Sequence, residues 1–352
     1  MAHNLEKHDF VAFRTEQHVG SGVNFFNAAQ PWWAREGIDF ADGGNWTRYG
    51  TPIDHLAKDA TGDDVLAACK LDWTVSKRRL FDADGNEVKS HRGLFRDDVN
   101  SNLGVVGKDW HVTQNKVGFD FIVPFLQKGQ AHLDSAGSCK GSKLVWLSAK
   151  LNESFALFDG RDTHEAFLLF AISHQSGVAN HAKLVATRTV CNNSLDINVE
   201  GYSRHWFRWD HTKPFSVEEA QERLGIARKA FQDEKALYES FTEVSLSKTA
   251  DIVSFFKKTY GLTDPKPEDK KAEEKEERNN KIIEALLGSY HTQPGKEFGE
   301  GSLWQALNAV TYHVDNVAGR NGQHGFASSQ FGNGSGIKHR AKIIAKQFAL
   351  AA

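Results

Sequence analysis

Between residues 71 and 199, short apolar runs alternate with turn residues, which is the pattern of an antiparallel sheet. LDWTVSKRRLF and EVKSHRGLF flank a DADGN turn, in which Asp84-Gly85 supplies the positive φ angles that a tight hairpin needs. VGFDFIVPFLQKG has helical apolar spacing, so we expect one helix to pack on this sheet. Further strands are predicted at DWHVTQN, KLVWLSAKL, SFALFDG, HEAFLLFAISHQ and NHAKLVATRTVC.

After Pro214 the apolar residues recur at helical spacing. Ser216 and Glu219 form a capping box at the start of SVEEAQERLGIARKAFQ, which therefore predicts a helix. More helices are predicted at LSKTADIVSFFKKTYG, KIIEALLGSY, SLWQALNAVTYHVDNV and IKHRAKIIAKQFALAA, with GRNGQHGFASSQFGNGSG as a loop before the last. The predicted fold class is α+β: an antiparallel, hairpin-rich central sheet with packed helices, followed by a helical C-terminal region.

These patterns divide the chain into five parts. We expect an irregular Trp/Gly-rich leader over residues 1–60, an α+β core over 61–213 and a helical pair over 214–262. Residues 263–280 mix acids and bases after two prolines, which is typical of a solvated linker or an exposed helix face. Residues 281–352 form a helical C-terminal region with a basic tail.

The composition is that of an ordered, near-neutral globular protein. The 352 residues include 43 Lys and Arg and 45 Asp and Glu, for a net charge of −2. The three cysteines show no CxxC pairing, the first residues lack an apolar signal region, and no apolar run approaches the roughly 20 residues of a membrane span. We therefore expect a cytoplasmic protein with reduced thiols and no membrane partner.

Motifs for common enzyme chemistry are missing from the sequence. GSCKGSK departs from the spacing of a triphosphate-binding loop, and His164-Glu165 lacks the second histidine of a zinc motif. We expect no cofactor and no metal. An alternative keeps Asp97, Asp98 and Asp120 as Mg²⁺ ligands of a nuclease, although acids in turns and caps have the same pattern.

Two clusters of cations and aromatic residues indicate a binding function. Lys77, Arg78 and Arg79 lie between Trp73 and Phe81 on one hairpin strand, and Arg92 lies on the other. A basic ribbon with aromatic rings can follow a sugar-phosphate chain while bases stack on the rings. The second cluster, with Arg188 on the preceding strand, comprises Arg204, Trp206, Arg208 and Trp209.

The second cluster leaves three interpretations open. Mixed cation and indole surfaces suit single-stranded nucleic acid, and they also suit protein interfaces, where Trp and Arg are enriched. Core tryptophans beside surface arginines give the same pattern. The tail adds Lys338 and Arg340, because from Gly319 onward there are five Lys or Arg residues and no acid. Such a tail is a candidate phosphate contact or a solvated helix end.

Three segments resemble a known family: GKDWHVTQNKVGFDFIVPFLQKG, SAGSCKGSKLVWLSAKL and ISHQSGVANHAKLVATRTVCNNSL. They are similar to phage- and plasmid-encoded proteins with a large domain of unknown function, found near markers of lateral gene transfer. The resemblance covers roughly residues 10–260 and is most specific at Thr187 to Asn193. It implies a mobile-element context. The order of elements is also similar to that of Rad-type and Red-beta-type single-strand annealing proteins.

Together these features give three hypotheses. The first is a non-enzymatic, homo-oligomeric protein that binds, or anneals, single-stranded DNA in replication, transfer or recombination of a phage or plasmid. The second is a protein-interaction or assembly factor whose partner is a host protein. The third is the metal-dependent nuclease.

Overall fold

The computed structural model describes residues 10–13, 51–53, 61–128, 130–188, 193–196, 207–266, 271–318 and 323–351. Its centre is an eight-stranded sheet in the order β10-β9-β8-β7-β6-β1-β2, with β11 also paired to β9. All neighbours are antiparallel except β1 and β2, which are parallel. The strands are β1 (Phe10–Phe13), β2 (Thr51–Ile53), β6 (Ala131–Cys139), β7 (Leu144–Leu157), β8 (Asp162–Ser173), β9 (Asn180–Arg188), β10 (Ser194–Asp196) and β11 (Phe207–Trp209).

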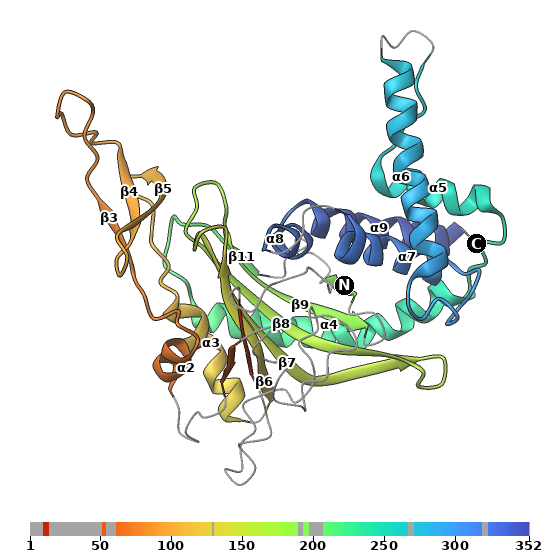
Figure 1. Cartoon of the computed structure of the whole chain (residues 1–352). Coiled ribbons are helices and arrows are strands. Elements are labelled where there is room, and N and C mark those ends of the chain that lie inside the picture. The colour runs from red at the N-terminus through yellow and green to blue at the C-terminus, as the bar shows by residue number, and fades with distance from the viewer. Residues whose placement is uncertain are drawn as a thin grey trace.

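Strands β8 and β9 are buried along most of their length because both faces of this main sheet are covered. On one face Phe170 packs on α3 (Lys116–Gln127) and Phe155 packs on Phe231 of α4 (Val217–Glu243), with ring centroids 5.1 Å apart. On the other face Lys183 lies over the Phe331 ring of α8 (Gln323–Phe331). Figure 1 shows α3 and α4 on one side of the sheet and α8 on the other.

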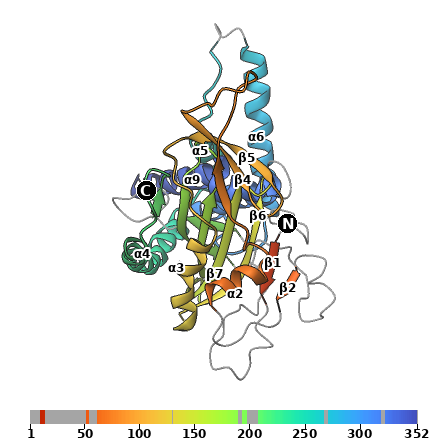
Figure 2. The ribbon, with the colours of Figure 1, turned by 90° about the vertical axis from the view of Figure 1, so that its left-hand side faces the viewer.

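The hairpin predicted from the sequence projects from this body as part of a second, three-stranded sheet, which we call the arm (Figures 1 and 2). It contains β3 (Val75–Arg78), β4 (His91–Arg96) and β5 (Ser101–Gly107), all antiparallel. In the hairpin turn Gly85 has φ +83°, and the Asp82 carboxylate accepts hydrogen bonds from the amides of Asp84 and Asn86. β5 was not predicted from the sequence.

The prediction of a strand at DWHVTQN is wrong. In this segment the side chains of Gln114 and Asn115 make hydrogen bonds to neighbouring chain segments. Gln114 both donates to and accepts from the backbone of Val75. The Asn115 amide donates to the carbonyls of Leu71 and Trp73, and its oxygen lies 2.9 Å from His174 Nε2. These bonds fix the root of the arm to α3 and the main sheet.

The remaining helices form the C-terminal half of the molecule, as the sequence predicts. Ser216 caps α4 through the amide of Glu219. The predicted loop at residues 319–336 is wrong in part, since it contains α8 and the start of the last helix, and the linker predicted at 263–280 becomes helical at Ala272. The C-terminal helices are α5 (Thr249–Tyr260), α6 (Ala272–Thr292), α7 (Leu303–Tyr312), a π-helical turn (His313–Val317) and α9 (Asn333–Ala351). The short helix α2 (Gly62–Ala68) lies instead before the arm in the sequence. Within the described ranges no helix combines the length and apolarity needed to cross a bilayer.

Candidate nucleic-acid interface

Most of the predicted arm cations are used within the arm itself. Lys77 Nζ donates to the carbonyls of Lys108 and Trp110, at 2.9 and 2.8 Å. Arg78 pairs with Asp97 at 3.0 Å and stacks on Phe95, and Arg92 pairs with Glu87 at 3.4 Å. Arg79 is exposed. The arm therefore offers less unpaired positive charge than its sequence indicates.

Arg188 is not on an open sheet surface. It is 2% exposed, its Nε lies 2.7 Å from Asp162 Oδ1, and its Nη atoms donate to the carbonyls of Pro294 and Gly295. An arginine enclosed in this way fixes the loop after α6 to the sheet. Its guanidinium, predicted to lie on the sheet surface, is therefore enclosed and paired.

Trp209 is also a core residue rather than a stacking surface. It is 4% exposed and packs on Phe170 and Phe215, with ring centroids 5.2 and 4.6 Å apart. Of the same cluster, Arg204 and Trp206 lie outside the described residues. Arg208 is exposed on β11 and remains available.

Two lysines of the basic tail, Lys338 and Lys342, are buried. Lys338 is 1% exposed and its ammonium lies within 3.1 Å of Asp315, Ser194 and Ser329. Lys342 pairs with Glu234 at 2.5 Å. Lys338 is therefore enclosed and its charge is neutralised inside the protein, so it does not offer a surface cation.

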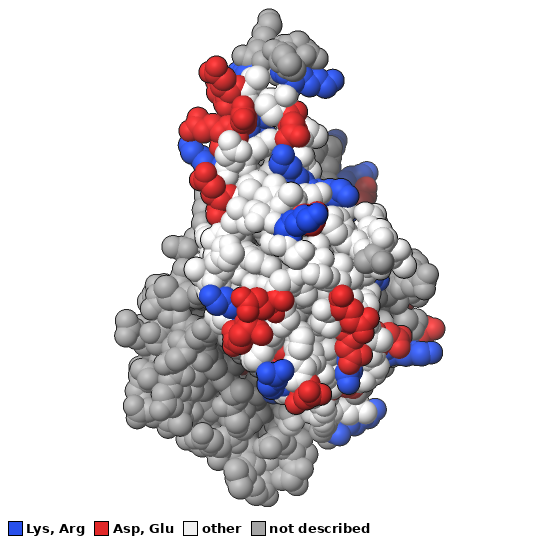
Figure 3. Space-filling view, turned by 90° about the vertical axis from the view of Figure 1, so that its right-hand side faces the viewer, with Lys and Arg blue, Asp and Glu red and all other residues white. Residues whose placement is uncertain are grey.

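Arg340 is the tail residue of the predicted set that faces outward. It is exposed, and Nη1 donates to the carbonyl of Thr259 at 3.2 Å. On the side of the molecule that carries α6, acidic and basic side chains are interspersed, so this face presents no single-sign patch (Figure 3).

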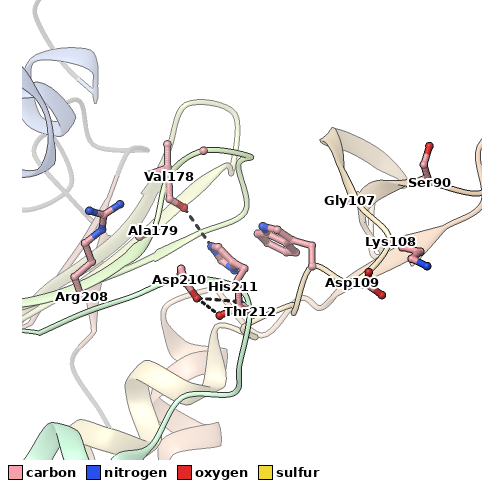
Figure 4. A pocket seen from close by; sticks show the side chains of 12 residues that line it. Ser90, Gly107, Lys108, Asp109, Val178, Ala179, Arg208, Asp210, His211 and Thr212 are labelled. Atoms are coloured by element: carbon pink, nitrogen blue, oxygen red, sulfur yellow. Dashed lines mark hydrogen bonds between the residues drawn. The ribbon is translucent and has the colours of Figure 1, made fainter.

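A pocket of about 540 Å³ lies between the segment that follows β5 of the arm and the β8–β9 turn of the main sheet (Figure 4). Lys108 and Asp109 reach it from the arm side, and Arg208 and His211 come from β11 and the segment that follows it. The other lining residues are Ser90, Gly107, Trp110, Gly177, Val178, Ala179, Asp210 and Thr212.

An aromatic pair is the centre of this pocket. Trp110 is half-buried and stacks on His211, with ring centroids 3.7 Å apart and planes inclined by 18°. The turn after β5 positions it, since the Trp110 amide donates to Gly107 and the His111 amide donates to His211. We refer to Trp110 and His211 as the stacked pair.

Both ring nitrogens of His211 face carbonyl oxygens: Nδ1 lies 3.0 Å from His111 O and Nε2 lies 3.2 Å from Val178 O. A neutral imidazole can donate to only one of them. Burial lowers the pKa of His211, while the two carbonyls act in the opposite direction. At neutral pH the uncharged ring therefore donates one hydrogen bond, to the carbonyl of either His111 or Val178.

Two cations and two acids surround the stacked pair, but they are not equally engaged. The Asp210 carboxylate accepts hydrogen bonds from the amide and hydroxyl of Thr212, which lower its pKa. Lys108 and Arg208 carry exposed side chains on opposite sides of the pocket, and the Lys108 side chain points away from His211 (Figure 4). The pocket thus combines aromatic faces with two cations that can meet a phosphate.

Of the residues predicted from the sequence, Arg208 lines this pocket, whereas Lys77 only donates to the backbone of Lys108 and Trp110. Trp110 was not among the predicted residues. The signal was present, because Lys108 and Trp110 stand close together beside the basic hairpin. Residues 109–115 were predicted to form a strand, so Trp110 was not predicted to line a binding site.

The three acids of the nuclease hypothesis are engaged separately. Asp97 bonds Ser76 and Arg78, Asp98 pairs with Arg96, and Asp120 lies 3.2 Å from Lys116. In the part of the chain that the structure describes, no three His, Cys, Asp or Glu side chains gather as a metal site requires.

Comparison with known proteins gives one match. Neither a curated protein nor a solved structure shows significant similarity to the chain. The model of the domain of unknown function DUF932 matches residues 102–338, a range that begins in β5 and ends in α9. It includes Trp110, His211 and Arg208, and it covers more than half of the chain. The chain belongs to the DUF932 family.

Proposed function

We propose that the protein binds single-stranded nucleic acid in the pocket between the arm and the main sheet. The observation that supports this most directly is the stacked pair lining a 540 Å³ pocket beside Lys108 and Arg208. Pockets of this size hold small ligands, and an unpaired base exposes a flat face that an indole can stack on. A base pair inside a duplex does not expose such a face.

Stacking, rather than charge, supplies most of the affinity in this proposal. The net charge is −2, and Arg78, Arg92, Arg188 and Lys338 are already paired within the protein. Alanine substitution of a stacking residue typically costs about 1–3 kcal/mol per base. We therefore expect binding with a shallow dependence on salt.

The biological setting is proposed from the resemblance to phage- and plasmid-encoded proteins. Such elements expose single strands during replication, transfer and recombination. A protein that holds single strands by stacking on unpaired bases suits these processes, including annealing, and homo-oligomerisation would extend the contact along a strand.

Trp110→Ala tests the proposal. We expect at least a tenfold loss of affinity for labelled dT20 in fluorescence anisotropy, because the variant loses the stacking surface. Phe81→Ala is the matched control, since Phe81 is 60% exposed at the hairpin turn and does not line the pocket. Absence of binding by the wild-type protein to dT20 and rU20 at low salt would overturn the proposal.

Protein interaction through the arm is the second candidate function. Phe81 and Val99 are each 60% exposed on the arm, and Val105 is 48% exposed on its outer strand β5. Exposed apolar side chains on and near an edge strand favour contact with another protein. This function predicts a partner, a second copy or a host protein, that remains bound after nuclease treatment and is lost in Phe81→Asp.

A further inference from the structure

A second pocket, of about 380 Å³, adjoins the first at the same end of the main sheet. Val178, in the turn between β8 and β9, lines both pockets, so they lie on either side of one residue. The second pocket is bounded by the β6–β7 turn, the β8–β9 turn and the junction of α8 and α9.

The chemistry of the two pockets differs. Lys140 and Lys143 line the second pocket together with Gln175, Ser328 and Asn333, and its lining includes no Asp or Glu. The first pocket contains the stacked pair and balances two cations with two acids. One pocket is suited to a flat ring and the other to an anion.

The β6–β7 turn holds the two lysines toward this side of the sheet. Lys140, Gly141 and Ser142 have φ angles of 55°, 65° and 67°, three successive left-handed residues that reverse the chain tightly. Arg96 of the arm donates to Ser142 Oγ at 2.9 Å. The turn that carries the lysines is therefore tied to the arm that forms the first pocket.

We infer that the second pocket binds backbone phosphates of the same single strand whose base stacks on Trp110. The strand passes over Val178, with a base in the first pocket and neighbouring phosphates beside Lys140 and Lys143. This inference rests on the proposed function and defines the ligand as an oligonucleotide longer than the first pocket alone can hold.

The test compares Lys140→Ala/Lys143→Ala with the wild-type protein on dT4 and dT20 over a range of salt concentrations. Each lost phosphate contact on a single strand lowers the slope of log K against log [salt] by about 0.7. We expect the slope for dT20 to fall by about 1.4 and the affinity for dT4 to stay within twofold. Lys140→Arg/Lys143→Arg should restore the slope, and thermal melting should show that the variants fold.

Lys271→Ala/Lys281→Ala is the matched control. Both lysines are more than two-thirds exposed and lie at the start of α6 and within it, so this variant removes the same charge away from both pockets. An unchanged slope for dT20 in the Lys140/Lys143 variant, or equal losses on dT4 and dT20, would overturn the inference while Trp110→Ala still tests the first pocket. Failure of the wild-type protein to bind either oligonucleotide would overturn the proposed function itself.

Discussion

Lys338 shows how much one interior charge can matter to this protein. Lys338→Ala would leave the Asp315 carboxylate buried without its ammonium partner, which lies 2.8 Å away and is as buried as the acid. Breaking a buried pair in this way typically costs about 3–5 kcal/mol. We expect a loss of that size in urea unfolding, whereas Arg340→Ala, two residues further along the same helix and exposed, should cost less than about 1 kcal/mol. Equal losses in the two variants would contradict this role.

His174 makes stability depend on pH. Its Nε2 donates to Asn115 Oδ1, because the Asn115 amide already donates to two carbonyls, and its Nδ1 has no partner within the described residues. Burial lowers the pKa of His174 from 6.5 to about 3, and the nearby His211 acts in the same direction. The folded protein therefore resists protonation at this residue.

The unfolded chain takes up this proton first as the pH falls. Stability that is complete above about pH 6.5 is lost progressively below it, by roughly 2 kcal/mol for this residue between pH 7 and pH 5. His174→Gln keeps a donor for Asn115 and cannot titrate. Between pH 7 and pH 5 the free energy of unfolding of this variant, measured in urea, should therefore fall by roughly 2 kcal/mol less than that of the wild-type protein. The remaining pH dependence includes His164, whose pKa burial lowers to about 4, and His211 and His313, whose pKa values burial also lowers. The same pH dependence in both proteins would exclude His174 as its source.

At the scale of elements, α3 and β8 pack closely because residue 118 of α3 is a glycine and has no side chain. A Cβ on Gly118 would lie 2.7 Å from Cδ1 of Phe170, so Gly118→Ala must displace either the ring or the helix. We expect a destabilisation of about 1–3 kcal/mol in thermal or urea unfolding, although alanine favours helix. Gly225→Ala in α4, where nothing lies within 4 Å of the added atom, should instead be neutral or stabilising by up to about 1 kcal/mol. A neutral Gly118→Ala would show that the packing there is loose.

Elements with local signals could be predicted from the sequence, and those defined by distant partners could not. The hairpin, the long strands β8 and β9, and α4 with its Ser216 cap follow from turn residues, apolar runs and capping. The strand expected at residues 109–115 was wrong because Gln114 and Asn115 bond backbone about 40 residues earlier. The sequence pattern around residues 109–115 does not indicate a hydrogen-bond partner so far away in the chain.

At the scale of the whole molecule, several basic residues that the sequence placed on the surface lie in the interior. Five cations after Gly319 suggested a basic surface, yet Lys338 and Lys342 pair with Asp315 and Glu234 in the interior. Trp209 and Arg188 likewise became core residues, since a sequence does not show which face of a strand a later helix covers. The candidate interface therefore contains Trp110 rather than residues of the tail or β9. Arg208 is exposed, as predicted from the sequence.

The buried lysine on β9 also orders events during synthesis. Lys183 Nζ contacts the carbonyl of Gln330, 147 residues later, and its partner Asp196 accepts from Ser335, 139 residues later. A ribosome delivers β9 and β10 long before α8 and α9, so the β9–β10 edge of a nascent chain keeps these charges hydrated. These buried contacts cannot form until α8 and α9 have been synthesised. Contacts between residues so far apart in the sequence slow the final step of folding.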